Sequence, residues 1–278
     1  MSIKLKIAHQ IDGFMLDRLG KQDGIISLTP VFHVERLYND SYFSNLLEFC
    51  QGYKARSGMR AVLTCMTPHS PILARDLLLN GFDPAAYWDR IGALKEHGLI
   101  GLHGHFIRGF DGNQPIPMHC SFYDMNKIRD QIITEQDALH SRHLTDPDTL
   151  IYSGGWWFTS APLRAFLVSR GFRWDYSLSS SPFNRSPGSD ALITSEGAGV
   201  IVQTFGDRII KSAIAVSSIA KPSRPYHAAT KIWAQRKRQR QGDITLSLYS
   251  HDYDLNVDPA LHFVDRALAT GLSFAEPA

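Results

Sequence analysis

Apolar and polar residues alternate in blocks whose spacing changes along the chain. Short apolar runs rich in β-branched residues predict buried strands at residues 25–32, 60–66, 99–102, 149–152, 200–204 and 244–249. Apolar residues spaced three and four apart predict helices at residues 42–56, 70–80, 85–97, 125–144, 161–170 and 260–270. Strands that alternate with helices predict a parallel sheet covered by helices. With this many units in one chain, a β/α barrel is favoured over an open sheet.

The length of the chain fits one large β/α domain, and its composition argues against several function classes. The 278 residues carry 29 basic and 27 acidic side chains, and the net charge of +2 gives no case for nucleic acid or an anionic membrane surface. We expect an N-terminal extension over residues 1–23, a single barrel domain over residues 24–278 and a long surface loop at residues 177–198. No apolar run is long enough for a signal peptide or a membrane span, and the three cysteines lie far apart. These features predict a soluble cytoplasmic protein.

Polar residues that can bind a metal or move protons follow several of the predicted strands. His33 and Glu35 follow the first strand, and His103-Gly104-His105 follows the third. Corresponding positions later in the chain hold Gly154-Gly155-Trp156-Trp157, Trp174-Asp175 and His251-Asp252-Tyr253-Asp254. Because the carboxyl ends of parallel strands in a β/α fold meet at one face, we expect these side chains to converge on one site.

These residues have structural interpretations as well as chemical ones. His103 and His105 fall on one side of an extended chain, and imidazole is a common zinc ligand, so the pair favours a metal site. A single histidine at a strand end, such as His33 or His251, can also be purely structural. Glu35 can be a site carboxylate or only an acidic residue at the start of a helix.

Other features leave similar alternatives open. The Gly154-Gly155 pair either lets the backbone approach a ligand, with a following tryptophan stacked on a sugar ring, or forms a turn above core indoles. Asp175 is either a site residue or a cap. His140 and His143 lie near the end of a predicted helix, where imidazole suits the helix dipole. The basic run at residues 231–240 is interpreted as a solvated helix face.

The order of four short motifs resembles the polysaccharide deacetylase superfamily (NodB-like, carbohydrate esterase family 4). The motifs are IGLHGH at residues 100–105, YSGGWW at 152–157, GFRWDYSL at 171–178 and LYSHD at 248–252. The resemblance covers roughly residues 24–270. It implies a distorted (β/α)7 barrel that removes an N- or O-acetyl group from a carbohydrate with metal-activated water.

The resemblance also implies roles for individual residues. His103 corresponds to the first metal-binding histidine of the family, and His251 to the acid that protonates the leaving group. Asp175 corresponds to an acid that tunes the site. Gly154 and Gly155 lie in the segment that shapes the sugar cleft, and Trp156 and Trp157 beside them are predicted to bind substrate.

Three positions differ from the family pattern. His33 stands where the family has an aspartate, Ile107 where it has the second metal histidine, and Ser153 where it has an arginine. One interpretation is a rebuilt site for a divalent metal, with zinc favoured, and the other is a barrel without metal. The rebuilt site would comprise His33, His103 and His105 as ligands, with Glu35 or Asp252 as the base.

The function predicted first is a divergent carbohydrate deacetylase. Its expected substrate is an acetylated sugar such as a nucleotide-sugar, a lipid-linked glycan or a soluble oligosaccharide. One alternative is a catalytically inactive barrel that binds carbohydrate at Trp156 and Trp157. Another is a metal-free acid–base enzyme that uses His103, His251 and Asp252 and keeps its activity in a chelator.

Overall fold

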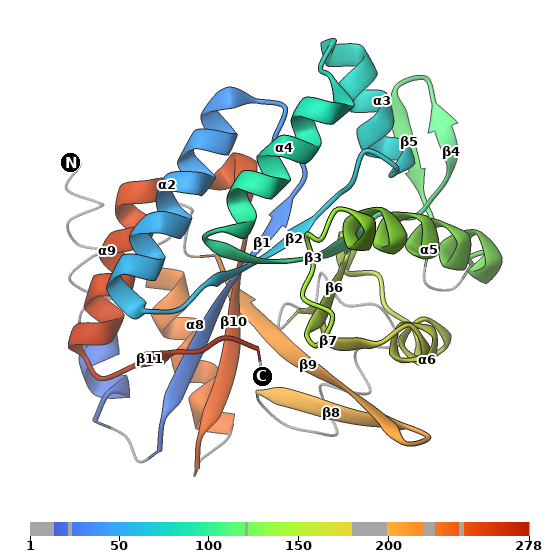
Figure 1. Cartoon of the computed structure of the whole chain (residues 1–278). Helices are drawn as coiled ribbons and strands as arrows, with labels where there is room; N and C mark the ends of the chain where they lie inside the picture. The colour runs from blue at the N-terminus through green and yellow to red at the C-terminus, as the bar shows by residue number, and fades with distance from the viewer. Residues whose placement is uncertain are drawn as a thin grey trace.

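Seven parallel strands close into a barrel in the computed structural model, which describes residues 14–21, 24–119, 122–179, 199–218, 226–238 and 242–277 (Figure 1). In order around the barrel, the strands are β1 (Ile26–Val34), β2 (Ala61–Cys65), β3 (Gly98–Gly104), β6 (Leu150–Gly154), β7 (Phe172–Ser179), β9 (Arg208–Ser217) and β10 (Ile244–His251). Strand β10 pairs with both β1 and β9, which closes the ring. The predicted (β/α)7 fold of the NodB-like type is confirmed.

Side chains of the strands alternate between the inside and the outside of the barrel. A small cluster at its centre contains Val31, Val62, Leu99, Ile151, Trp174, Tyr176 and Ala213. Because the side-chain period of a strand is two, His33 shares the inner face with Val31, and Ser153 shares it with Ile151. Phe32 belongs instead to the larger core between strands and helices. The carboxyl ends of these strands therefore direct polar side chains into the barrel, next to the apolar cluster at its centre.

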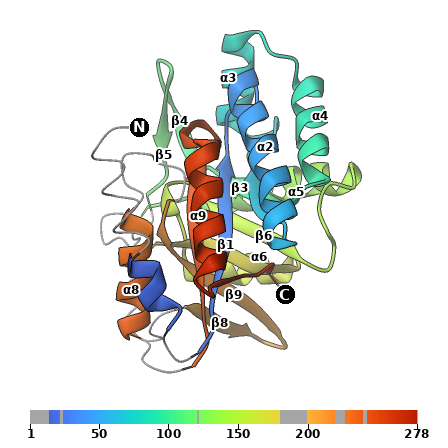
Figure 2. The same ribbon diagram turned by 90° about the vertical axis from the view of Figure 1, so that its left-hand side faces the viewer.

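Helices cover the outside of the barrel (Figures 1 and 2). They are α2 (Asp40–Ser57), α3 (Pro71–Asn80), α4 (Pro84–Lys95), α5 (Met125–Ser141), α6 (Ala161–Ser169), α8 (Tyr226–Arg238) and α9 (Val257–Ala269). Asn39, Asp124 and Ser160 cap α2, α5 and α6 by accepting hydrogen bonds from free backbone N–H groups. The predicted helices are all present, with ends shifted by at most three residues.

The strands depart from the sequence prediction in the second half of the chain. The predicted strand at residues 200–204 is β8 (Val200–Phe205), which lies outside the barrel and pairs antiparallel with β9. Strand β9 itself, which the pattern did not predict, completes the barrel. Local periodicity cannot tell which of two adjacent strands joins the closed barrel and which pairs at its outside. Two shorter features were also missed: the hairpin of β4 (Ile107–Asp111) and β5 (Gln114–Pro117), and β11 (Ser273–Phe274), which pairs with β1.

The described residues before β1 pack on the barrel domain. Leu16 and Leu19, in a helical segment at residues 14–19, are buried in the main core. Within the predicted loop at 177–198, residues 177–179 belong to β7, and residues 180–198 lie outside the described part of the chain, as does Cys120. The described helices include none with the length and apolar character needed to cross a membrane.

Candidate functional site

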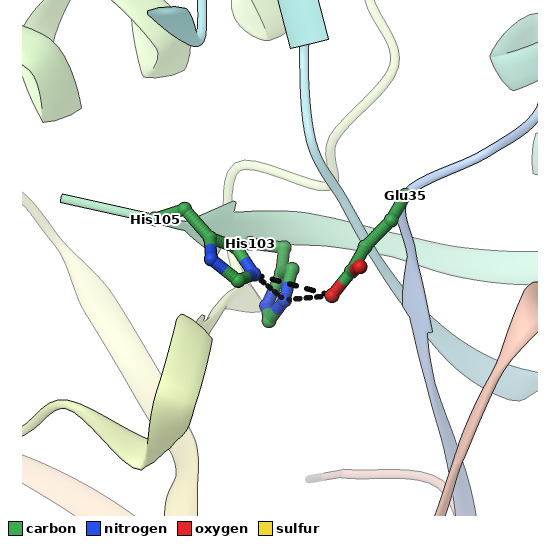
Figure 3. Close-up of side chains that lie close together, drawn as sticks. All are labelled: Glu35, His103 and His105. Carbon is green, nitrogen blue, oxygen red and sulfur yellow. Dashed lines mark hydrogen bonds and ion pairs between the residues drawn. The ribbon is translucent and has the colours of Figure 1, made fainter. Parts of the chain in front are cut away.

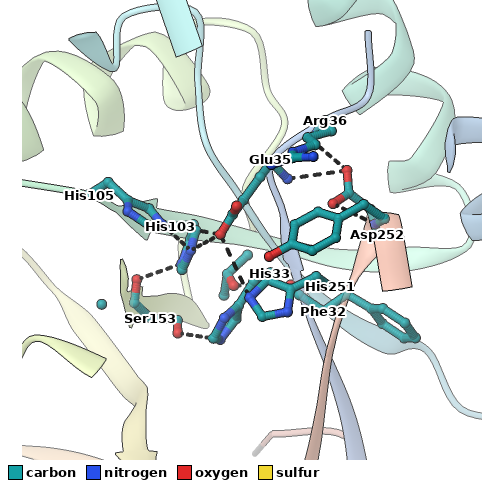
Figure 4. Close-up of polar contacts among 12 residues, drawn as sticks. Phe32, His33, Glu35, Arg36, His103, His105, Ser153, His251 and Asp252 are labelled. Carbon is teal, nitrogen blue, oxygen red and sulfur yellow. Dashed lines mark hydrogen bonds and ion pairs between the residues drawn. The ribbon is translucent and has the colours of Figure 1, made fainter. Parts of the chain in front are cut away.

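Polar side chains converge at the carboxyl-terminal end of the barrel (Figure 4). Strand β1 carries His33 and is followed by Glu35, and β3 carries His103 and is followed by His105. His33 pairs in register with His251 at the end of β10. Parallel barrel strands all end at one rim, so residues that are far apart in the sequence meet there.

Glu35, His103 and His105 form the tightest group at this rim, which we call the Glu–His–His cluster (Figure 3). Glu35 Oε1 lies 3.2 Å from His103 Nε2 and 3.1 Å from His105 Nε2, and the two Nε2 atoms are 2.9 Å apart. His103 and His105 are buried, whereas Glu35 is partly exposed. One carboxylate oxygen and two imidazole nitrogens therefore face a common point.

Hydrogen bonds and burial set the protonation of the cluster. His103 Nδ1 donates to the carbonyl oxygen of Ser153 at 3.1 Å, which leaves the Nε2 lone pair directed at Glu35 and His105. Burial lowers the pKa of His103 to about 4, so its ring is neutral at pH 7. Burial alone would raise the pKa of Glu35, but the contacts with His103 and His105 outweigh it and hold that pKa well below its usual value. The cluster therefore offers a carboxylate and an imidazole lone pair at neutral pH.

His33 lies beside the cluster. Its Nε2 atom is 2.9 Å from Ser153 Oγ, and its ring stacks on that of His103 with centroids 4.4 Å apart. Burial and the neighbouring His103 lower the pKa of His33 well below its usual value. The metal-ligand group found among the described residues contains Glu35 in the place that the sequence interpretation gave to His33. The residue predicted as a base thus lies among the candidate metal-ligating side chains, and His33 supports the ring of His103.

Asp252 fixes the backbone that carries Glu35. Its carboxylate accepts hydrogen bonds from the backbone N–H groups of Glu35 at 3.2 Å, Arg36 at 2.6 Å and Tyr253 at 3.0 Å. Burial raises the pKa of Asp252 to about 7, against the opposing effect of these bonds. Asp252, predicted as an alternative base, therefore ties the end of β1 to the end of β10.

His251 approaches the cluster through Glu35 (Figure 4). Its Nε2 atom lies 3.9 Å from Glu35 Oε1, and its Nδ1 atom lies 3.6 Å from Asp254 Oδ2. The side chain of His251 is 24% exposed, against 9% for His105 and 0% for His103. A carboxylate near one ring nitrogen and a partly exposed side chain suit proton transfer. Asp254, which the sequence analysis placed with His251 at the same strand end, lies one helical turn after it.

The segment after β6 forms a strained turn against the cluster. Trp156 and Trp157 both have a left-handed backbone, with φ of 51° and 59°, which is uncommon for residues other than glycine. The Trp156 ring lies edge-on to His105 at 4.4 Å and is 46% exposed. Trp157 instead lies against His33, with ring centroids 5.5 Å apart. Trp156 is therefore the tryptophan placed to contact a ligand, and Trp157 packs inward.

Asp175 acts on this turn from the outer face of β7. Its Oδ1 atom accepts from the Ser177 N–H at 2.9 Å and from the Ser177 hydroxyl, whose oxygen accepts from the Gly154 N–H at 2.7 Å. Thr159 and Arg164 lie on its other side, and burial raises the pKa of Asp175. The structure therefore places Asp175 in support of the Gly154 backbone and not beside the predicted metal ligands.

Gly155 lets the turn touch His105. A Cβ atom at this position would lie 2.4 Å from the His105 ring. We expect Gly155→Ala to displace that ring, to destabilise the fold by about 1–3 kcal/mol and to weaken about tenfold the binding of zinc added as a probe of the candidate metal cluster. Urea unfolding and chelator competition measure the two effects. Gly92→Ala in α4 is the control, because nothing lies near its added Cβ, and wild-type zinc affinity in Gly155→Ala would contradict the prediction.

The three donor atoms of the cluster fit a divalent metal ion. Tetrahedral zinc with bonds of about 2.05 Å holds its ligand atoms about 3.3 Å apart. The separations of 2.9, 3.1 and 3.2 Å in the cluster are close to this value. His105 Nε2 also offers at most one proton to two acceptors, the Glu35 carboxylate and His103 Nε2. A cation would satisfy both acceptors, and three protein ligands leave one coordination position open.

Comparison with known proteins identifies the fold. No family model and no curated protein matches the chain. Similar solved structures include a protein from Mycobacterium smegmatis assigned as a polysaccharide deacetylase, with a TM-score of 0.51 and 13% identity over 90% of this chain and 84% of that one. The Puue allantoinase has a TM-score of 0.50 and 12% identity over 88% of this chain and 83% of its own. A 4-alpha-glucanotransferase from Thermococcus litoralis has a TM-score of 0.50 and 13% identity over 90% of this chain but 37% of its own length. At these identities the likeness shows the fold alone.

Proposed function

We propose that this protein is a metal-dependent hydrolase that removes an acyl group, in the simplest case acetyl, from an amide or ester of a carbohydrate. The observation that carries the proposal is the convergence of Glu35, His103 and His105 on a common point. The carbohydrate class is supported by the exposed Trp156 ring beside His105, since a sugar ring can stack on indole. Fold likeness to a protein assigned as a polysaccharide deacetylase adds to this support.

The cluster and its neighbours have distinct roles in this proposal. Glu35 Oε1, His103 Nε2 and His105 Nε2 would hold the ion. A divalent cation in such a site supplies polarisation of the acyl carbonyl and lowers the pKa of a water molecule. The Ser153 carbonyl keeps His103 in the tautomer with a free Nε2 lone pair, and Asp252 holds the backbone of Glu35.

His251 is the group that moves the proton. In the hydrolysis, the water oxygen bonds to the acyl carbon, the bond from that carbon to the leaving nitrogen or oxygen breaks, and a proton passes from water to the leaving atom. His251 Nε2, 3.9 Å from Glu35, can take this proton and return it, while Asp254 near Nδ1 stabilises the imidazolium. His33 has a lowered pKa and its Nε2 atom is hydrogen-bonded to Ser153 Oγ, so it does not compete with His251 for the proton released by water.

We expect His251→Gln to lower kcat for acetate release by at least about a hundredfold without loss of bound metal. The assay follows acetate released from a panel of N- and O-acetylated sugars by the wild type and the variant, with and without a chelator. His69→Gln, which changes an exposed histidine outside the cluster, is the matched control.

Each outcome of this assay separates the proposed function from its alternatives. Full activity of His251→Gln would contradict the role given to His251. Activity that survives complete metal removal would identify an acid–base enzyme that needs no metal. Binding of sugars without any acetate release would identify a carbohydrate-binding barrel.

A further inference from the structure

We infer that Gln131, Glu135 and Thr67 form a positioning unit that fixes His105 from behind, an inference that rests on the proposed metal site. Gln131 Nε2 donates to the backbone oxygen of His105 at 3.0 Å and to Glu135 Oε1 at 2.7 Å. Glu135 Oε2 accepts from the Thr67 hydroxyl at 2.7 Å and from the Thr67 N–H at 3.4 Å. The unit therefore joins helix α5 to the segments that follow β2 and β3.

His105 needs such support because its second ring nitrogen, Nδ1, has no orienting hydrogen bond among the described residues. A metal-binding histidine usually donates its second ring N–H to a carboxylate or carbonyl, as His103 does to Ser153. His105 Nδ1 is instead buried without a hydrogen-bond partner among the described residues. Its ring is held by packing against Gly155 and Trp156, so the direction of its Nε2 atom depends on where the main chain of His105 sits.

A carboxylate at position 135 has no evident use in packing. Glu135 is 1% exposed and lies on the buried face of α5, where its neighbours Ile132 and Leu139 are also fully buried. An apolar side chain there would avoid the cost of burying a polar group. The contacts of Glu135 lead instead to Thr67 and, through Gln131, to the backbone of a proposed ligand. This path is the reason to assign Glu135 to the site and not to the core.

The test removes the two hydrogen bonds by which the Gln131 amide connects Glu135 to the backbone of His105. We expect Gln131→Met, which has similar volume, to weaken zinc affinity at least about tenfold and to change the absorption spectrum of the cobalt-loaded protein. Gln136→Met is the matched control, because the Gln136 amide on the same helix also binds backbone, but that of Arg170, outside the cluster. Its zinc affinity and cobalt spectrum are expected to match the wild type. Urea unfolding of both variants separates lost stability from lost affinity.

Wild-type zinc affinity and an unchanged cobalt spectrum in Gln131→Met would overturn the inference, whatever the stability of that variant. Glu135→Gln keeps an oxygen that can accept from Gln131 and is expected to retain zinc affinity, whereas Glu135→Leu is expected to lose it as Gln131→Met does. If the wild type binds no zinc, the proposed function fails. The positioning is then decided on the metal-free protein, where the NMR signals of the His105 ring should shift in Gln131→Met and not in Gln136→Met.

Discussion

Replacing His103 with alanine is expected to abolish stoichiometric metal binding. His103 Nε2 is one of three converging donor atoms, 3.2 Å from Glu35 Oε1 and 2.9 Å from His105 Nε2. Loss of an outer partner of a ligand typically weakens metal affinity by about 10- to 100-fold, and loss of a ligand itself should cost more. Mass spectrometry of untagged protein should find close to one zinc, cobalt, nickel or iron per wild-type chain and almost none in the variant.

The control for this variant is a histidine elsewhere in the chain, and a second variant removes another donor of the cluster. His140→Ala should bind metal as the wild type does, because His140 lines a surface pocket at the amino-terminal end of β3. Alanine at the buried position 103 leaves a cavity, so Glu35→Gln provides a second, nearly isosteric loss of a donor. Zinc at a thousand times its Kd stabilises a protein by about 4 kcal/mol, and this gain should disappear in both variants. Folded wild-type protein that stays metal-free in excess zinc would refute the proposed metal site.

The barrel was predictable because most of its strands and helices are marked locally. The apolar run of β1 and the change to helical spacing in α2 are typical of a β/α unit, and Asn39 between them caps the helix. Strand β9 lacks such a mark, since its first residues are Arg208, Ile209, Ile210 and Lys211. Its place in the barrel depends on pairing with β7 and β10, which no local pattern records.

The site was predictable in part. The sequence pattern indicates where a strand ends, but it does not indicate the course of the backbone after that end. Alternation along an extended chain places His33 and Glu35 on one face, and both were predicted for the site. Strand β1 ends at Val34, however, and hydrogen bonds to Asp252 carry the backbone of Glu35 across the rim. Glu35 therefore joins His103 and His105 in the candidate metal-ligating group, while His33 stays inside the barrel beneath it. Only the tertiary contact with Asp252 distinguishes these two outcomes.

The residues that support the cluster from outside, Asp175, Gln131 and Glu135, were not given these roles by the sequence for a different reason. Asp175 follows Trp174 in β7, but side-chain alternation turns it to the outer face, toward Arg164. Gln131 and Glu135 come from helix α5, whereas the site residues predicted from the sequence lie at strand ends. A signal for Glu135 was present: a carboxylate on the apolar face of an amphipathic helix is unusual and favours a partner in the core.

Replacing Glu135 with glutamine is expected to stabilise the metal-free protein above pH 7 and to flatten its dependence on pH. Burial raises the pKa of Glu135 from 4.5 to about 7, so the folded state holds this proton more tightly than the unfolded state. Between these two pH values the folded protein binds more protons, and its free energy of unfolding falls as the pH rises. At about 1.4 kcal/mol per pKa unit, the loss approaches about 3 kcal/mol and is complete above pH 7.

Urea unfolding of metal-free wild type and Glu135→Gln at pH 5 and pH 8 measures this loss. Burial also raises the pKa of Asp252 and Asp175, so the wild type has other sources of pH dependence, and only the difference between the two proteins isolates Glu135. From pH 5 to pH 8 the wild type should lose about 2–3 kcal/mol more than the variant. An equal loss would contradict the raised pKa of Glu135. The expected loss means that the Glu135 carboxylate destabilises the fold near neutral pH, so stability does not account for a carboxylate at this position.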